Sequence, residues 1–383
     1  MIAYIREQGA KISREGRRLI VTTPDMKRTL FADSLEQLFL FGNVQLTPPA
    51  LFLLLREDID TVFLRADGRY MGRLSTREQA NVFLRKRQFA LLDDPAFCLK
   101  VARRIVQAKL VNQATVMARI KRSHSQALAG QAASALRELA RKAEGVGTVD
   151  ALRGLEGSGA ALYFKHLHLA FKEDWGFTQR VRRPPTDPVN AVLSLLYTLL
   201  INRCYAAVRI AGLDPYPAAL HSLTYGRHSL PLDLVEEFRA MLADTLTIAL
   251  FNLRMLDWED FESPAPEPPE EEMPVDDAAA DAVLHDPLGA MTPGAGATDV
   301  SDLAGEQMEA APTANAPWKR PVLLCNAAFR KVLTVFAKKM ETEFQHPTAE
   351  RQMTYNDALI FQARQYRRLV EGEVDAYTPL TLR

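Results

Sequence analysis

The sequence has few cysteines, no long apolar run and no net charge. Its three cysteines, Cys98, Cys204 and Cys325, are odd in number and far apart, so we expect free, buried thiols in a reducing cytoplasm rather than disulfides or a cysteine zinc site. No apolar run reaches the roughly 18 residues of a membrane span. The N-terminal stretch carries Arg6 and Lys11 and has no apolar core, unlike a signal peptide. We therefore expect a cytoplasmic protein without a membrane segment.

The absence of net charge is an average over two unlike parts. The chain has 47 Lys and Arg against 47 Asp and Glu, which at first disfavours an enzyme that acts on nucleic acid. Residues 257–318, however, contain sixteen acids and no Lys or Arg. The rest of the chain keeps all 47 basic residues against 31 acidic ones, a balance of +16. Such an excess is what phosphate binding requires.

A nucleotide-binding loop is also missing, because no G-x-x-x-x-G-K-[ST] run occurs in the chain. We therefore expect no nucleotide cofactor.

The spacing of apolar residues divides the chain into parts. Residues 1–88 alternate over short segments and predict a small β-rich domain, with Asp67-Gly68 as the turn of a hairpin and Thr47 as the cap of a short helix. From residue 89 to 262 the period is helical. Residues 263–317, rich in proline, alanine and acids, predict a disordered insert. Residues 318–383 predict two amphipathic helices, 321–344 and 354–370, that complete the helical domain. The fold class expected is α+β, a small β-sheet domain followed by a larger all-α domain.

One stretch, residues 212–239, brings a histidine close to several acids. His221 precedes a polar loop and then a helix that carries Asp233, Glu236 and Glu237. The i, i+3, i+4 spacing predicts that the three carboxylates lie on one helix face. An imidazole aimed at that face suits Mn²⁺ or Mg²⁺ better than zinc, because no cysteine joins the cluster. A core histidine beside a solvated acidic face explains the same spacing.

A second stretch, residues 152–164, places Glu156 in a run of small residues. Small residues let another backbone or a substrate approach closely. A carboxylate there needs a partner, since an isolated buried charge is costly. Glu156, His221 and Glu236 would together form a Glu/His/Glu site. Ser229 is expected to cap the helix that bears Glu236.

Two parts of the sequence carry basic residues that could contact DNA. A proline-rich loop carries Arg180, Arg182 and Arg183, which could hold a phosphodiester backbone or form ordinary ion pairs. Others are scattered over the first helical segments, where we expect them to form a surface that faces DNA through many modest contacts. These are Arg85, Lys86, Arg87, Arg103, Arg104, Lys109, Arg119, Lys121 and Arg122.

Four motifs in this order resemble the family of CRISPR-associated protein one, the integrase and endonuclease of spacer acquisition. They are the glutamate in a glycine-rich run (residues 154–164), the Arg-Arg-Pro-Pro-Thr-Asp-Pro-Val-Asn-Ala segment (182–191), the histidine that ends a segment beginning with Gly-Leu-Asp-Pro (212–221), and the Ser-Leu-x-x-Asp-Leu-x-Glu-x-Phe-Arg helix (229–239). The resemblance covers the chain except for the insert.

The resemblance implies a mechanism and site residues. Glu156, His221 and Glu236 would bind Mg²⁺ or Mn²⁺, with Asp233 in a second shell or as an alternative ligand. Arg239 could contact phosphate. In the all-α catalytic domain, a 3′-hydroxyl of spacer DNA would attack a phosphodiester of the CRISPR array by transesterification.

The resemblance also implies partners: spacer-precursor DNA and the CRISPR repeat, a second copy of the chain paired through the N-terminal domain, and the small CRISPR-associated protein two. Two other functions remain open from the sequence. One is a metal-dependent endonuclease that acts on branched or single-stranded DNA, and the other is an inactive DNA-binding scaffold. The insert 263–317 is either a solvated linker or an acidic segment that competes with DNA for the basic surface.

Overall fold

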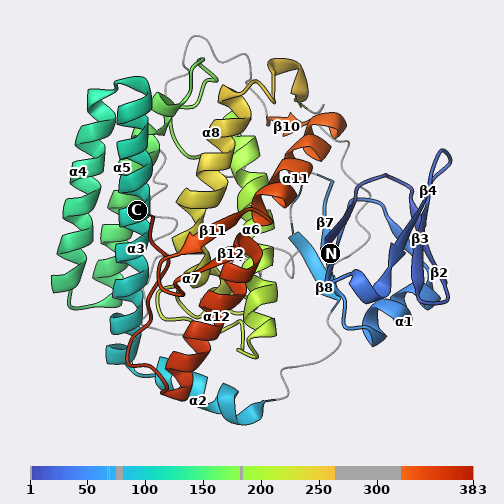
Figure 1. The fold of residues 1–383 in the computed structure, drawn as a ribbon, viewed down its shortest axis with the longest axis horizontal. Helices are drawn as coiled ribbons and strands as arrows, with labels where there is room; N and C mark the ends of the chain where they lie inside the picture. Colours follow the sequence, from blue (N-terminus) through green and yellow to red (C-terminus); the bar gives the residue numbers. More distant parts are fainter. Residues whose placement is uncertain are drawn as a thin grey trace, which may run out of the picture. The chain divides into compact units, whose positions relative to one another are not determined.

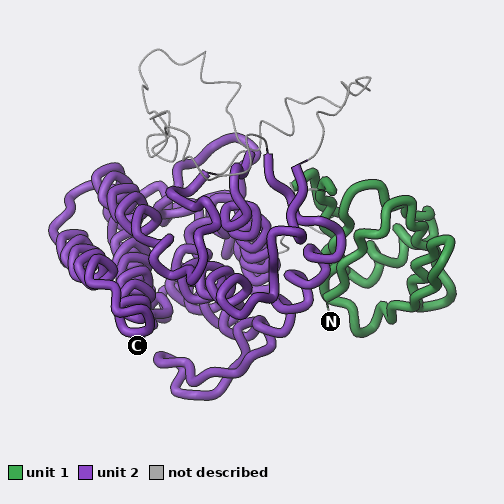
Figure 2. The backbone as a smooth tube through the Cα atoms, turned by 90° about the horizontal axis from the view of Figure 1, so that it is seen from above, with its two compact units in different colours: residues 1–80 green, residues 81–383 purple. Residues whose placement is uncertain are grey.

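The computed structural model describes residues 2–66, 68, 70–74, 81–181, 184–263 and 321–382. The chain divides into two compact units, residues 1–80 and 81–383 (Figure 2). The sequence places this boundary at residue 88, inside helix α2 (Val82–Leu92), which Asn81 caps. Residues 81–88 lie in the helical unit, where the Gln88 amide donates to the Asp214 carbonyl at 2.9 Å.

The first unit contains two four-stranded sheets. One has the order β1-β5-β7-β8, in which β1 (Ile2–Ile5), β5 (Gln37–Phe41) and β7 (Asp60–Leu64) are parallel and β8 (Tyr70–Leu74) is antiparallel to β7. The other has the order β4-β3-β2-β6. Here β2 (Lys11–Glu15), β3 (Arg18–Thr22) and β4 (Lys27–Phe31) form a meander, and β6 (Gln45–Leu46) pairs parallel with β2. A 3₁₀ turn, η1 (Ala32–Ser34), precedes β5.

Local sequence chemistry explains these elements. The Thr47 hydroxyl caps helix α1 (Pro48–Arg56) by accepting from the Ala50 N–H, as predicted. The predicted hairpin is the β7–β8 pair, and Gly68 in its turn has φ +91°, a conformation that favours glycine. Alternating residues such as Ile12 and Leu38 are buried in one apolar core. The small β-sheet domain is therefore confirmed.

The second unit is helical (Figure 1). Its elements are α2, α3 (Pro95–His124), α4 (Ala127–Lys142), η2 (Ala143–Gly145), α5 (Val149–Leu167), η3 (His168–Ala170), α6 (Pro188–Ile210), α7 (Ser229–Phe238), the π-helical η4 (Arg239–Asp244), α8 (Thr245–Asn252), η5 (Trp258–Asp260), α11 (Asn326–Met340) and α12 (Tyr355–Glu371). The long helix α3 contacts α4, α5 and α7, so one helix connects the two parts of the predicted site.

The predicted helix over residues 321–344 is wrong at both ends. Strand β10 (Leu323–Leu324) precedes α11, and β11 (Glu343–His346) follows it and pairs with β12 (Arg351–Thr354). The turn is held by the buried His346 ring, whose Nδ1 accepts from the Thr348 and Ala349 N–H groups. The predicted helix 354–370 is confirmed as α12, with Thr354 as its cap.

The two flanks of the insert meet. Strand β9 (Phe261–Glu262) pairs antiparallel with β10, and the Ser263 hydroxyl donates to the Pro321 carbonyl at 3.0 Å. Apart from Ser263, the predicted disordered insert 263–317 lies outside the described residues.

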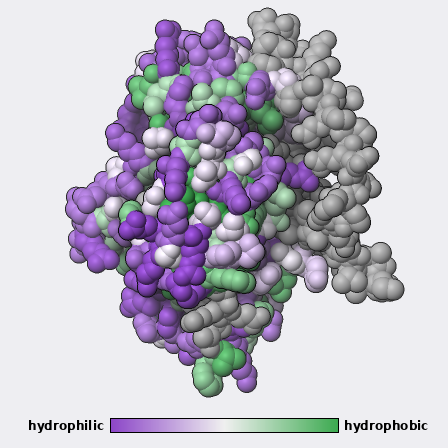
Figure 3. All heavy atoms as spheres, turned by 90° about the vertical axis from the view of Figure 1, so that its right-hand side faces the viewer, coloured by the Kyte–Doolittle hydropathy of each residue, from purple (hydrophilic) through white to green (hydrophobic). Residues whose placement is uncertain are grey.

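Among the described helices, α6 is long and apolar enough to cross a membrane. However, 72% of its most apolar window is buried within the protein, as expected for a core helix, and it runs among α7, α8 and α12 (Figure 1). On the face drawn in Figure 3, hydrophilic side chains predominate and hydrophobic ones form small, scattered groups.

Candidate active site

The loop before α7 is held by Ser229. The sequence predicts this residue as the cap of the helix, but the cap position is His228, which makes no side-chain capping bond. The Ser229 hydroxyl instead donates to the Ser222 carbonyl at 3.0 Å, one residue after His221. Ser229 therefore closes the loop that presents the histidine.

The buried Asp233 carboxylate fixes the position of His221. It accepts backbone hydrogen bonds from Ala219 and Leu220 at 2.9 Å and from His221 at 3.0 Å, and it contacts His221 Nδ1 at 2.7 Å. Because a carboxylate in this setting only accepts, Nδ1 carries a proton, and in the neutral ring the free lone pair is therefore on Nε2. Nε2 lies 3.9 Å from Glu236 Oε1. The hydrogen bonds of Asp233 thus orient the His221 ring and the loop that carries it.

Glu156 reaches the site because α5 and α3 approach closely. Thr148 caps α5, and Gly159 faces Leu110 of α3 so tightly that a Cβ at this position would fall 2.2 Å from Leu110 Cδ2. The small residues predicted to allow close approach do so here. One turn before Gly159, Glu156 Oε1 contacts the ammonium of Lys109 on α3.

Lys109 lies between the two glutamates. Its ammonium contacts Glu156 Oε1 and lies 2.6 Å from Glu236 Oε2, and the residue is 6% exposed. Burial acts to lower its pKa, but the two carboxylates outweigh burial and the pKa is raised. Lys109 is therefore not part of the exposed basic surface to which the sequence assigned it.

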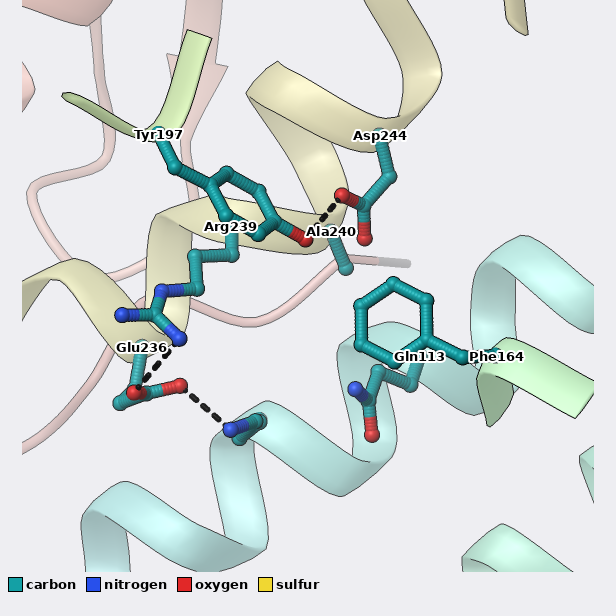
Figure 4. A pocket seen from close by; sticks show the side chains of 8 residues that line it. Gln113, Phe164, Tyr197, Glu236, Arg239, Ala240 and Asp244 are labelled. Carbon is teal, nitrogen blue, oxygen red and sulfur yellow. Dashed lines mark hydrogen bonds and ion pairs between the residues drawn. The ribbon is translucent and has the colours of Figure 1, made fainter. Parts of the chain in front are cut away.

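Glu236 is a buried carboxylate surrounded by basic side chains. Burial acts to raise its pKa, but Arg239, Lys109 and His221 together lower it to about 2. Arg239 Nη1 lies 3.2 Å from Glu236 Oε1 (Figure 4). The carboxylate is therefore ionised at neutral pH although it is buried.

The prediction that Glu237 shares the face of Asp233 and Glu236 is wrong. Its carboxylate points to the C-terminal segment, where it accepts from the Tyr377 hydroxyl, the Leu380 N–H and the Gln362 amide. Burial raises its pKa to about 7 although these hydrogen bonds oppose the shift. Glu237 thus holds the C-terminal segment to α7, and its carboxylate does not face the site that contains Glu236.

Of the three loop arginines, Arg180 is the one described. Its guanidinium donates to Asn190 Oδ1 at 2.8 Å and to Ser194 Oγ at 3.0 Å, and it lies 5.3 Å from the centre of the Tyr197 ring. These bonds hold the loop to α6. Arg182 and Arg183 lie outside the described residues.

A small pocket of about 10 Å³, with room for one water-sized group, lies beside Glu236 (Figure 4). Arg239 lies 5.1 Å from the centre of the Tyr197 ring, and the Tyr197 hydroxyl donates to Asp244 at 2.6 Å. Since a π turn closes over five residues, Arg239 and Asp244 can face the same side. The lining residues are Lys109, Gln113, Phe164, Tyr197, Glu236, Arg239, Ala240 and Asp244.

Lys109 and Arg153 are site residues that the sequence did not assign. The sequence spacing indicates that Lys109 is buried, because Ile105 precedes it and Gln113 follows it by four residues on the buried side of α3. No sequence pattern indicates the role of Arg153. Its guanidinium donates to the Leu220 carbonyl at 2.7 Å and holds the histidine loop to α5.

The described residues contain no group of three His, Cys, Asp or Glu arranged to hold a metal ion as they stand. The donor set nevertheless fits Mg²⁺ or Mn²⁺, because carboxylate oxygens, of which the site has two, are the protein ligands that suit both ions. Glu156 and Glu236 already share one cation, the Lys109 ammonium, and His221 Nε2 lies next to Glu236. We conclude that the residues fit a divalent ion.

The chain is similar in sequence to a known family along most of its length. The profile of the family described as "CRISPR associated protein Cas1" matches residues 3–267. "CRISPR-associated endonuclease Cas1 3" of Thermus thermophilus is 30% identical over 385 residues, which cover 100% of this chain and 97% of the relative. "CRISPR-associated endonuclease Cas1 1" of Moorella thermoacetica is 36% identical over 248 residues, 62% of this chain and 71% of the relative.

Solved structures share the fold. A Cas1 protein from Thermotoga maritima superimposes with a TM-score of 0.74 at 18% identity and 97% coverage of both chains. A casposase bound to integration product gives 0.76 at 16% identity, covering 100% of this chain and 93% of its own. A chain of a Cas6-RT-Cas1–Cas2 complex gives 0.76 at 21% identity, covering 100% of this chain and 36% of its own. With the family profile over most of the sequence and a relative at 30% identity along its full length, the chain belongs to the Cas1 family of CRISPR-associated proteins.

Proposed function

We propose that this protein joins the 3′-hydroxyl ends of spacer DNA to a CRISPR array by metal-dependent transesterification. The observation that carries the proposal is the convergence of Glu156 and Glu236 on one cation, with His221 Nε2 beside them, in a chain of the Cas1 family. The neighbour bound to an integration product adds support at the level of the fold.

In this reaction the oxygen of the attacking 3′-hydroxyl forms a new ester bond to phosphorus. The bond from phosphorus to the 3′-oxygen of the array strand breaks, and the proton lost by the attacking hydroxyl is balanced by the one gained by the released hydroxyl. One ester replaces another, so no nucleotide is consumed. A bound Mg²⁺ or Mn²⁺ would supply the positive charge that polarises the scissile phosphate.

The chain's own residues prepare this chemistry. Glu156, His221 and Glu236 would hold the ion, and Asp233 keeps the Nε2 lone pair of His221 directed at the site. Arg239, which pairs with Glu236 and faces the pocket, adds a permanent positive charge for the phosphate. Burial of Glu236 excludes water from its carboxylate and strengthens each of these interactions.

The partners in this proposal are DNA, a second copy of the chain through its N-terminal sheet unit, and the small Cas2 protein. The basic excess outside residues 257–318 supports the DNA partner. The likeness in fold to a chain of a solved Cas6-RT-Cas1–Cas2 complex supports the Cas2 partner.

A second candidate is endonucleolytic hydrolysis of branched or single-stranded DNA by the same site. The names of the relatives, which call them endonucleases, favour it. The two reactions differ in whether a DNA hydroxyl or a water attacks.

The nucleophile can be tested directly. The protein, its Cas2 partner, Mn²⁺ and a supercoiled plasmid with a leader and repeat are incubated with a labelled duplex that ends in 3′-hydroxyls or in 3′-deoxy termini. The proposal predicts that label joins the plasmid only from the 3′-hydroxyl duplex. Nicking without joining, equal for both duplexes, would favour the endonuclease, and binding without either reaction would leave only a scaffold.

A further inference from the structure

The ammonium of Lys109 lies where a bridging divalent ion would lie. It contacts one oxygen of Glu156 and, at 2.6 Å, one oxygen of Glu236. Mg²⁺ binds carboxylate oxygens at about 2.0–2.1 Å. An ion bound to the same two oxygens would therefore overlap the ammonium, and the two positive charges would repel each other in a buried site. Lys109 and the ion exclude each other from this position.

The metal-free site depends on the lysine. Without Lys109, the Glu236 carboxylate, in a residue only 3% exposed, would keep Arg239 as its nearest strong cation, and Glu156 would no longer reach across to α3. Two carboxylates brought together without a cation repel each other. The lysine thus links α5 and α7 through α3.

The pocket beside Glu236 offers the lysine a second position. Gln113 lies one turn along α3 from Lys109, is 4% exposed, and its Oε1 has no hydrogen-bond partner among the described residues. Gln113 and the Asp244 carboxylate both line this pocket. Lys109 itself lines the pocket, so its flexible stem lies beside these acceptors, and the pocket has room for one ammonium-sized group.

We propose that Lys109 is an internal cation that holds the metal-free site together and moves into the pocket when a divalent ion binds, so that it sets the affinity of the site for the ion. This inference rests on the metal site of the proposed function. It assigns Lys109 a positioning role, since the lysine acts through the two glutamates.

Competition between the Lys109 ammonium and the ion can be measured without an activity assay. Electron paramagnetic resonance of free Mn²⁺ reports how much Mn²⁺ the protein binds. Lys109→Met keeps the unbranched apolar stem, one heavy atom shorter than that of lysine, and removes the charge. We expect Lys109→Met to bind Mn²⁺ at least about tenfold more tightly than the wild type, a change of about 1.4 kcal/mol. We also expect a lower Tm in EDTA and a larger rise of Tm on adding Mn²⁺. The matched control is Lys100→Met on the same helix, whose exposed ammonium contacts the Asp375 carbonyl.

Equal or weaker Mn²⁺ binding by folded Lys109→Met would overturn the inference while leaving the metal site intact. Absence of Mn²⁺ binding in both proteins would overturn the metal site of the proposed function as well. If Lys109→Met does not fold, a crystal structure of the wild type with Mn²⁺ decides: the inference requires the Lys109 ammonium to have left the two glutamates, and an ammonium still in contact with both beside a bound ion would contradict it.

Discussion

Asp233 Oδ1 lies 2.7 Å from His221 Nδ1, and the same carboxylate accepts three backbone N–H groups of the segment that ends in His221. One buried side chain therefore fixes the loop, the ring orientation and the tautomer of the histidine. Groups that orient a metal-binding histidine in this way usually matter nearly as much as the ligand itself.

We predict that Asp233→Asn lowers both Mn²⁺ affinity and joining activity by about 10–100-fold. An amide cannot accept all four hydrogen bonds, because its NH₂ group would face backbone donors. The control is Asp33→Asn, which removes an exposed carboxylate paired with Arg17 in the first unit. Wild-type affinity and activity in folded Asp233→Asn would show that His221 does not need this partner.

Asp187 gives a prediction for the pH dependence of stability. It caps α6, and burial raises its pKa from the ordinary 3.8 to about 6, against the opposing effect of its hydrogen bonds with Asn190. Since the folded state binds the proton more tightly, its contribution to the free energy of unfolding is greatest below pH ~4. That contribution falls by about 3 kcal/mol as the pH rises through about 6, and it is constant above.

Asp187→Asn keeps a good cap and removes the titration. We expect the variant to lose this slope between pH ~4.5 and ~6.5 when both proteins are unfolded by urea. Asp94→Asn, the same exchange at the exposed cap of α3, is the control. Parallel profiles of wild type and Asp187→Asn would contradict the prediction.

The loop arginines give a prediction for DNA binding. Replacing Arg182 and Arg183 together with Ala should weaken binding and reduce the salt slope of log K by about 0.9 for each phosphate that the loop no longer neutralises. A double variant with the same change of charge, Arg137→Ala with Arg141→Ala on α4, serves as control. A slope that does not change would place the loop outside the DNA path.

The insert can be removed without disturbing the paired flanks. Deleting residues 264–317 leaves Trp318, Lys319 and Arg320 as a three-residue connection between Ser263 and Pro321, whose contact at 3.0 Å shows that the ends are close enough. We expect an unchanged Tm.

If the twelve acids of that segment compete with DNA, the deletion tightens DNA binding at low salt and the gain disappears at about 1 M salt. A full-length variant with these acids changed to Asn and Gln should behave in the same way. Equal affinity of all three proteins at low salt would leave the insert as a spacer.

Much of this fold follows from local sequence. Thr47 caps the helix that the sequence predicts it to cap, and Thr354 begins the helix predicted from that residue, because a hydroxyl and a following apolar period act within one turn. The β11–β12 hairpin was missed because its turn is organised by His346, whose burial depends on distant residues such as Phe361.

The site could be predicted only in part, because its geometry also depends on residues that are distant in the sequence. Spacing placed Asp233, Glu236 and Glu237 on one helix, but only the C-terminal segment, through Tyr377 and Leu380, decides that Glu237 faces away. The role of Lys109 depends on three helices meeting, which no local pattern contains.

The most direct test of the central claim is joining of a labelled 3′-hydroxyl duplex to a plasmid array by the wild type and by Glu156→Ala, His221→Ala and Glu236→Ala, each with Mn²⁺ or EDTA and with the Cas2 partner. We predict joining by the wild type with Mn²⁺ only, and none by the three variants, which should still bind the duplex. Joining in EDTA, or joining at the wild-type level by any of the three variants, would contradict a metal-dependent integrase built on these residues.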